Sequence, residues 1–308
     1  FMPMLTRNSL WAITDLQSVL YEKMELRSKM RHKLSSFVIL FKQTLHFMNT
    51  VIVPVDFSET SLHAAKYAAS LLTGQYGVNM ILYHSYGKVS EAAKATEMLE
   101  SLKADLMKNF IVKMEVLAHE ENDFVTGLEK AARHRKADLV IMGITGRSAI
   151  AQVFFGSNTL KMAETKVCPV LIVPEKADFA TIKNVMLTSD FKNTLESTPS
   201  AQIKDFLEAF KPQLHIVNVD NEHYISLTEN YEKEKQELKK MFEGYNPEFY
   251  FMRLFDVDEA ISLFAQSRNI DLIIAIQKNR SFLGKLLSGS RTKTLSYHST
   301  MPILVMHE

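Results

Sequence analysis

Residues 51–58 read Val51-Ile52-Val53-Pro54-Val55-Asp56-Phe57-Ser58, a short apolar run that ends in an acidic turn. A continuous run of β-branched residues is typical of a strand that is buried on both faces, as in a parallel sheet. Ser58 is a favourable N-cap residue, and apolar residues follow it at helical spacing at Leu62, Ala65, Ala69 and Leu72. The stretch therefore predicts a buried strand that leads directly into an amphipathic helix.

The alternation of strand and helix continues along the chain. Further strands are expected at 80–84, 112–117, 138–142 and 169–173, and further helices at 91–109, 123–135 and 158–165. Strands that alternate with helices of this length predict right-handed crossovers and a parallel sheet with helices on both faces. The fold class is therefore expected to be α/β and doubly wound.

This pattern occurs twice. Residues 141–175 align without a gap on residues 274–308, at an offset of 133. Residues 53–57 align with residues 187–191, at an offset of 134. We therefore expect two tandem copies of a doubly wound parallel five-stranded sheet, copy one over residues 48–176 and copy two over residues 177–308. The densely charged stretch 230–243 is interpreted as the solvated face of a helix in copy two.

Residues 1–47 stand outside the repeat. They carry seven Lys/Arg against three Asp/Glu and no glycine. The preferred interpretation is an appended helix or an upstream extension of the reading frame, because Met48 directly precedes the first strand. A secretion signal is the weaker alternative, since the apolar stretch 34–41 is short and Lys42 follows it. The role of this extension stays open.

Composition excludes several classes of function. The net charge is only +1 with basic and acidic residues interspersed, so a nucleic-acid partner is not expected. Cys168 is the only cysteine and lies in an apolar run, which excludes an internal disulfide framework and a thiolate zinc site. No apolar stretch is long enough to predict a membrane span. A cytoplasmic location fits these features best.

Three glycines lie in the connection that follows the fourth strand of copy one. Gly143 and Gly146 are separated by two residues, and after nine more residues the chain reads Gly156-Ser157-Asn158. Glycine lets backbone amides approach oxygens, and a helix N-terminus offers free N–H groups and a positive dipole. The connection therefore predicts a polyphosphate site at the carboxyl end of a buried strand. The alternative is that each glycine only makes a turn.

This spacing, the opening at residues 54–58 and the closing run at residues 168–174 resemble the universal stress proteins, whose ATP-binding members carry the same glycine pattern. The resemblance covers about residues 48–308 and implies a Rossmann-like, adenine nucleotide alpha hydrolase-like fold. It implies that Asp56 contacts the ribose or the adenine and that the glycine loop wraps the phosphates, with Arg147 either on the phosphates or merely solvated. The expected binding residues are Val55, Asp56, Met142, Gly143, Gly146, Arg147, Gly156, Ser157 and Asn158.

Copy two departs from the glycine pattern. Ile276 and Asn279 replace the first two glycines, while Gly289-Ser290 is retained. A side chain at 276 is expected to block the usual approach to phosphate. Because Asp190 matches Asp56, a vestigial pocket or another ligand stays open, but a structural or regulatory role is preferred for copy two.

The resemblance favours an ATP-binding regulatory or stress-response module, with Mg²⁺ accompanying the nucleotide. A pseudo-dimer of the two copies, through residues 170–173 and 303–306, is expected, with a homodimer as a further assembly. The alternatives are an enzyme that slowly hydrolyses ATP or transfers its adenylyl group, and an interaction scaffold with another small ligand. The sequence has no Gly-x-x-x-x-Gly-Lys-Ser/Thr loop and no His-Glu-x-x-His motif, and no catalytic or metal-binding residue is assigned. His84 either lines the nucleotide cleft or is packed.

Overall fold

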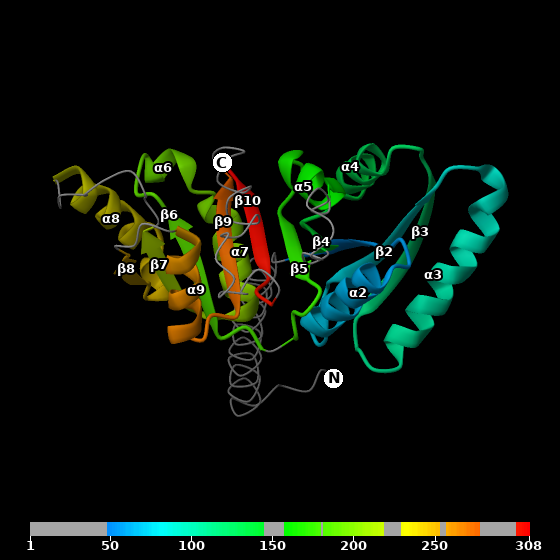
Figure 1. Ribbon diagram of the computed structural model, residues 1–308, viewed down its shortest axis with the longest axis horizontal. Coiled ribbons are helices and arrows are strands. Elements are labelled where there is room, and N and C mark those ends of the chain that lie inside the picture. Colours follow the sequence, from blue (N-terminus) through cyan, green and yellow to red (C-terminus); the bar gives the residue numbers. More distant parts are fainter. Residues whose placement is uncertain (1–47, 145–156, 180, 219–228, 253–256, 278–299) are drawn as a thin grey trace, which may run out of the picture. The chain divides into compact units, whose positions relative to one another are not determined.

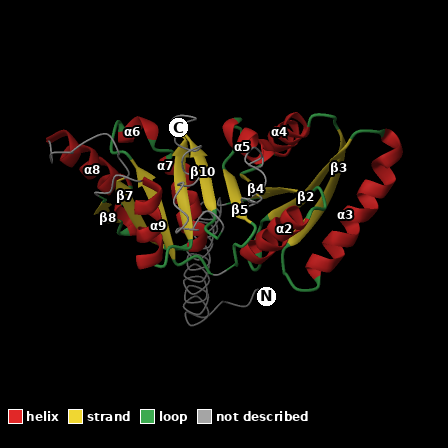
Figure 2. Cartoon of the chain, viewed as in Figure 1, coloured by secondary structure: helices red, strands yellow, loops and turns green. Residues whose placement is uncertain are grey.

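The computed structural model describes residues 48–144, 157–179, 181–218, 229–252, 257–277 and 300–308 (Figure 1). Residues 48–308 form one compact unit. Strands and helices alternate along this unit, as Figure 2 shows by colour. Among the described helices, none combines the length and the apolar character that crossing a bilayer requires.

Copy one contributes five strands and the helices between them. The β1 strand is short and buried, and the Ser58 hydroxyl accepts a hydrogen bond from the Ser61 N–H at the start of the first helix, as the sequence predicts. The elements are β1 (Thr50–Pro54), α2 (Glu59–Leu72), β2 (Asn79–Tyr86), η1 (Val89–Glu91), α3 (Ala92–Met107), β3 (Lys113–Glu120), α4 (Phe124–Arg135), β4 (Leu139–Ile144), α5 (Ser157–Glu164) and β5 (Val170–Pro174).

Copy two repeats this order, with one difference in its first helix. Two short helices stand where copy one has α2, and Pro199 lies between them. The elements are β6 (Asn184–Ser189), α6 (Thr194–Ser197), α7 (Ser200–Phe210), β7 (Gln213–Asn218), α8 (Glu229–Met241), η2 (Glu243–Tyr245), β8 (Glu248–Phe251), α9 (Val257–Ser267), β9 (Leu272–Gln277) and β10 (Ile303–His307).

The described strands form one ten-stranded sheet in the order β3-β2-β1-β4-β5-β10-β9-β6-β7-β8. Every neighbouring pair is parallel except β5 and β10. The predicted α/β class with parallel strands is thus confirmed. In each copy the strand order reverses once, between β1 and β4 in copy one and between β6 and β9 in copy two. Such reversals are where doubly wound folds hold their ligands.

Helices cover both faces of the sheet. Buried side chains of α2, α3, α7 and α8 pack on one face, and those of α4, α5 and α9 pack on the other. The strands between them are apolar on both sides: all five residues of β5 and all five of β10 are buried. This two-sided burial explains why the strands read as continuous apolar runs.

An aspartate ties two strands together at the amino edge of each copy. The Asp138 carboxylate accepts hydrogen bonds from the N–H groups of Asn49 (2.7 Å) and Thr50 (2.9 Å). Asp271 accepts from Lys183 (2.7 Å) and Asn184 (2.9 Å) in the same way. The contact links the start of the fourth strand of each copy to the start of its first. Sequence analysis gave these aspartates no role, because nothing near 138 in the chain shows that residue 50 lies beside it.

The two copies meet along β5 and β10. The strands pair antiparallel, with Ile303 opposite Ile172, Leu304 opposite Leu171 and Val305 opposite Val170 (Figure 1). An apolar edge strand favours unwanted pairing when it is left open. Here each of the two strands covers the open edge of the other.

Candidate functional site

The carboxyl end of β1 presents an oriented carboxylate. Asp56 is exposed, and its Oδ1 accepts hydrogen bonds from the Ser58 N–H (3.0 Å) and the Ser58 hydroxyl (2.6 Å). Partial burial would by itself raise the pKa of the Asp56 carboxyl, but hydrogen bonds involving Ser58 and Ser61 outweigh it, so this pKa lies below its usual value. Asp56 is therefore ionised at neutral pH.

The carboxyl end of β4 lies close to the start of α2. A Cβ on Gly143 would stand 2.6 Å from the Thr60 carbonyl oxygen and 2.8 Å from Thr60 Cγ2. Because one of these atoms is backbone, a side chain at 143 would push the helix away from the sheet. Gly143 is therefore required for packing in copy one, whatever its part in ligand binding. The sequence predicted a ligand role for Gly143, with a simple turn as the alternative, and gave no sign of the contact with Thr60.

The start of α5 is held against the end of β4. Thr159 is buried, and its hydroxyl donates a hydrogen bond to the Gly143 carbonyl oxygen at 2.9 Å. Ser157 is the first residue of α5, and Asn158 is exposed on its first turn. Thr159 was missed by sequence analysis because it falls just outside the glycine pattern. The bond fixes the helix N-terminus beside the strand end.

The nine predicted binding residues lie in different parts of the structure. Val55 and Met142 are buried core residues, so their side chains belong to the packing of the sheet. Asp56, Gly143, Ser157 and Asn158 lie at the β1 and β4 strand ends or on the first turn of α5. β1 and β4 are neighbours, with Val51 opposite Leu139 and Ile52 opposite Val140. Gly146, Arg147 and Gly156 lie outside the described residues.

His84 stands at the next strand end along the sheet. It belongs to β2, and its Nδ1 lies 2.7 Å from the Val55 carbonyl oxygen. The ring also packs against Phe57, with ring centroids 5.1 Å apart. Phe57 has a positive φ of 65°, so the chain turns sharply between β1 and α2. His84, Asp56 and the start of α5 thus lie near the carboxyl ends of β2, β1 and β4, in that order across the sheet.

The corresponding region of copy two is rebuilt. Ile276 occupies the place of Gly143 and is buried in the core. Thr194, at the start of α6, is the residue of copy two that aligns with Thr60. Its N–H (2.8 Å) and hydroxyl (2.7 Å) both donate hydrogen bonds to Glu234 Oε2. An acidic side chain of α8 therefore binds the start of this short helix. Asn279, Gly289 and Ser290 lie outside the described residues.

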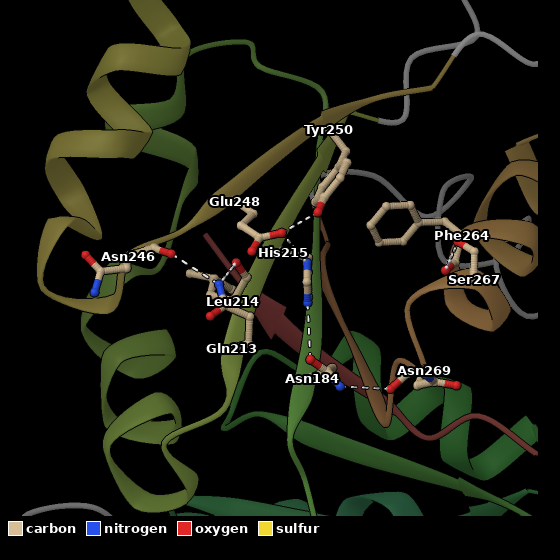
Figure 3. Close-up of polar contacts among 10 residues, drawn as sticks. All are labelled: Asn184, Gln213, Leu214, His215, Asn246, Glu248, Tyr250, Phe264, Ser267 and Asn269. Atoms are coloured by element: carbon tan, nitrogen blue, oxygen red, sulfur yellow. Dashed lines mark hydrogen bonds and ion pairs between the residues drawn. The ribbon is translucent and has the colours of Figure 1, made fainter.

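A second polar cluster lies in copy two, near the amino end of β6 (Figure 3). The buried His215 of β7 lies with its Nε2 3.3 Å from Asn184 Oδ1 and its Nδ1 3.5 Å from Glu248 Oε2. The Tyr250 hydroxyl donates to the same carboxylate oxygen, and the Arg268 guanidinium lies 4.9 Å from the Tyr250 ring centroid. This cluster is on neighbouring strands but away from the carboxyl strand ends.

Metal and thiol chemistry find little support in the described parts of the chain. Within those residues, no group of three or more His, Cys, Asp or Glu side chains is placed to hold a metal ion. Cys168 is buried, and burial followed by the negative charge of Asp138 raises the pKa of its thiol to about 12. Cys168 therefore stays a protonated thiol in the core.

Comparison with known proteins agrees with this architecture. The universal stress protein family matches residues 48–174 and 206–307. A Thermus aquaticus protein described as a universal stress protein in the QAH/OAS sulfhydrylase 3′ region is 28% identical over 134 residues, 40% of this chain and 97% of its own. A universal stress protein of Methanocaldococcus jannaschii is 29% identical over 143 residues, 40% of this chain and 80% of its own.

Among solved structures, a universal stress protein of Archaeoglobus fulgidus has the same fold over 86% of this chain and 98% of its own, with a TM-score of 0.60 and 19% sequence identity. The two matched regions follow one another along the chain, and each holds most of one copy. The chain therefore belongs to the universal stress protein family and carries its domain twice in tandem.

Proposed function

We propose that copy one binds ATP across the carboxyl ends of β1 and β4 and that the chain acts as a nucleotide-binding module of the stress response. One juxtaposition carries the proposal: the ionised Asp56 follows β1, and β1 is the neighbour of β4, whose carboxyl end is bonded to the start of α5. A carboxylate accepts hydrogen bonds from ribose hydroxyls, and a helix N-terminus favours phosphate. The glycine loop between β4 and α5 has the spacing of the ATP-binding members of the family.

The residues present fit this ligand. Ser58 orients the Asp56 carboxylate through two hydrogen bonds to Oδ1. Thr159 holds the first turn of α5 beside β4, so the free N–H groups of that turn face a fixed position. Mg²⁺ would enter with the phosphates, whose oxygens it prefers. In this proposal the domains span residues 48–176 and 177–308, and the β5–β10 pairing makes them a pseudo-dimer.

Copy two is proposed not to bind ATP. Ile276 fills the position where copy one has no side chain, and the Glu234 carboxylate binds the start of α6. A negative charge at that helix start opposes the approach of phosphate. The role of copy two in this proposal is to complete the sheet and to carry regulation.

Calorimetry tests the asymmetry between the copies. We expect one ATP per chain, and loss of measurable binding in Gly156→Val, because the valine adds bulk in the loop that faces the phosphates and restricts its torsion angles. Ser157→Ala should weaken binding by roughly ten- to a hundredfold, the value of one hydrogen bond to a charged group.

Gly289→Val in copy two is the matched control and should leave the affinity unchanged. Two sites of equal affinity, or a larger loss from Gly289→Val than from Gly156→Val, would contradict the assignment. Gly143→Val is not a clean test, because its Cβ would meet Thr60 and destabilise the fold. Thermal unfolding of each variant separates loss of the site from loss of the structure.

A further inference from the structure

Two buried polar side chains end neighbouring strands of copy two. Gln277 is the last residue of β9 and His307 is the last residue of β10, and the two are opposite each other in the register of the sheet. Gln277 is 6% exposed and His307 is 8% exposed. Within the described part of the chain, Gln277 Oε1 and both ring nitrogens of His307 are buried and have no hydrogen-bond partner. Three unpartnered polar atoms therefore lie at adjacent positions.

The two side chains are on the same face of the sheet. Side chains alternate along a strand, so Gln277 shares its face with Ala275, and His307 shares its face with Val305. Ala275 and Val305 are opposite each other and belong to one core cluster, the one to which α4, α5 and α9 contribute. Neighbouring strands are about 4.8 Å apart, so one small molecule can contact both the amide and the imidazole.

Copy one has apolar residues at the matching positions. Ile144 and Pro174 align with Gln277 and His307 at the offset of 133, and they too are opposite each other at the ends of their strands. Both are buried. The fold therefore does not require polar side chains there, and a buried polar atom without a partner destabilises a folded protein. A bound molecule that pairs with these atoms would remove the destabilisation.

The three atoms define the chemistry of such a molecule. Burial, and next the positive charge of Lys166, lower the pKa of His307, so its ring is neutral at neutral pH. A neutral imidazole has one N–H donor and one acceptor nitrogen, and the amide oxygen of Gln277 is an acceptor. Lys166 itself is exposed, so its charge is screened by solvent. The ligand must therefore donate and accept hydrogen bonds side by side, and it carries no charge because a buried ion needs a charged partner.

We propose that copy two has a binding site of its own at the ends of β9 and β10, for an uncharged ligand with an amide edge. In such an edge an N–H group stands next to a C=O group, as in an open-chain carboxamide or in the lactam ring of a pyrimidine base. The N–H donates to Gln277 Oε1, and the C=O accepts from the His307 ring. The strand order of copy two reverses between β6 and β9, which is where doubly wound folds hold their ligands.

Ligand-detected NMR on the full chain tests this site with two pairs of probes. Nicotinamide supplies an open-chain carboxamide and uracil supplies a lactam, while N,N-dimethylnicotinamide and 1,3-dimethyluracil are matched controls without the N–H. At least one parent probe should bind saturably with a dissociation constant of about 1 mM or lower, and its methylated control should bind at least about tenfold more weakly. The parent probe that binds identifies which kind of amide edge the site takes.

Two variants separate binding from folding. Gln277→Ile introduces the residue of copy one, and His307→Leu removes the ring. Each should weaken binding of the probe at least about tenfold. Without a probe, the thermal unfolding midpoint of either variant should equal that of the wild type or exceed it, because an unpaired buried polar group has been removed. With saturating probe, only the midpoint of the wild type should rise.

Several results would overturn the proposal. Failure of both parent probes to bind saturably would mean that these atoms bind water only. Tighter binding of nicotinate than of nicotinamide would contradict an uncharged ligand, and equal binding by the methylated controls or by the two variants would contradict the assigned bonds. If the variants do not fold, the comparison of each parent probe with its methylated control still decides, because it needs no variant. None of these results depends on ATP binding by copy one.

Discussion

Two glycines of copy one let a helix lie close to the sheet. Gly143 faces Thr60 of α2, and Gly127 of α4 faces Tyr83, where a Cβ would stand 2.6 Å from the hydroxyl oxygen. Tyr83 is fully buried, and its hydroxyl has no hydrogen-bond partner among the described residues. The added Cβ would also stand 2.8 Å from Glu121 Cγ. Copy two has Val217 and Ala260 at the positions of Tyr83 and Gly127. A smaller strand residue thus accompanies a larger helix residue.

This pairing predicts a non-additive pair of substitutions. Gly127→Ala should lower the free energy of unfolding by about 1–3 kcal/mol through overpacking. The higher helix propensity of alanine should offset up to about 1 kcal/mol of this loss. Tyr83→Phe should be neutral or stabilising because it removes an unpaired buried hydroxyl. In the double variant the cost of Gly127→Ala should shrink. Urea denaturation of the four proteins measures the coupling, and strictly additive effects would contradict the contact.

Strand ends could be predicted from the sequence, but contacts between residues far apart in the chain could not. The position of Asp56 after a buried strand was predictable, because an apolar run followed by a polar turn marks a strand end. The packing role of Gly143 was not, because Thr60 lies far from it in the chain and meets it only through the β1–α2 turn. Thr159 and His84 are likewise explained by contacts with backbone carbonyls that no local pattern reveals.

At the level of elements, the first helix of copy two differs most from its counterpart. α2 is continuous over Glu59–Leu72, whereas α6 and α7 are separate and Asn193 before α6 has a positive φ of 49°. The repeat in the sequence predicted the strands of copy two well, since their apolar runs match at a fixed offset. It did not predict the broken helix, whose cause is Pro199 together with the capture of Thr194 by Glu234.

The β6–β7–β8 ladder contains a buried histidine, His215, whose pKa is lowered. The Nδ2 of Asn184 donates to the Asn269 carbonyl oxygen, so its Oδ1 faces His215 and Nε2 carries the hydrogen (Figure 3). Nδ1 then turns its lone pair toward Glu248. Burial lowers the pKa of His215, and the positive charge of Arg268 adds to this, while Glu248 opposes it. Copy one has Ile81 at the matching position.

The lowered pKa predicts that acid weakens copy two. Above the unfolded-state pKa of about 6.5, His215 is neutral in both the folded and the unfolded state, and its protonation costs no stability. Below that pH, His215 takes up a proton in the unfolded state first, which favours unfolding. The free energy of unfolding should therefore fall as pH drops from 7 to 5. His215→Ile should make the slope shallower by at most about 1.4 kcal/mol per pH unit. Some slope should persist from His307, whose pKa burial and Lys166 also lower. Denaturation of both proteins at several pH values checks this, and parallel curves would refute it.

On the scale of the whole molecule, one antiparallel pairing joins two parallel half-sheets. Val170, Leu171, Ile172, Val173 and Pro174 are all buried in the full chain. Because β10 lies against this strand, the only strands with a free edge in the described sheet are β3 and β8. Each copy therefore depends on the other to cover an apolar edge.

Copy one expressed alone should consequently self-associate. A fragment of residues 48–176 would expose β5, and the simplest way to cover it is to pair with β5 of a second fragment. Size-exclusion chromatography with light scattering should show a dimer or larger species, while residues 48–308 show no association through this edge. A fragment that stays monomeric at micromolar concentration and keeps its far-UV circular dichroism would count against the dependence.

The aspartates at the amino edge give the duplication a history. Asp138 and Asp271 make the same pair of bonds to the chain, whereas the opposite edge differs at Gly143 and Ile276 and at His84 and Asn218. After a gene duplicates, each copy keeps the residues that its folding requires. It can change residues whose role the other copy already fills. The amino edge is the same in the two copies and the carboxyl edge is not, so the carboxyl edge of one half can change while the fold that the amino edge supports is kept.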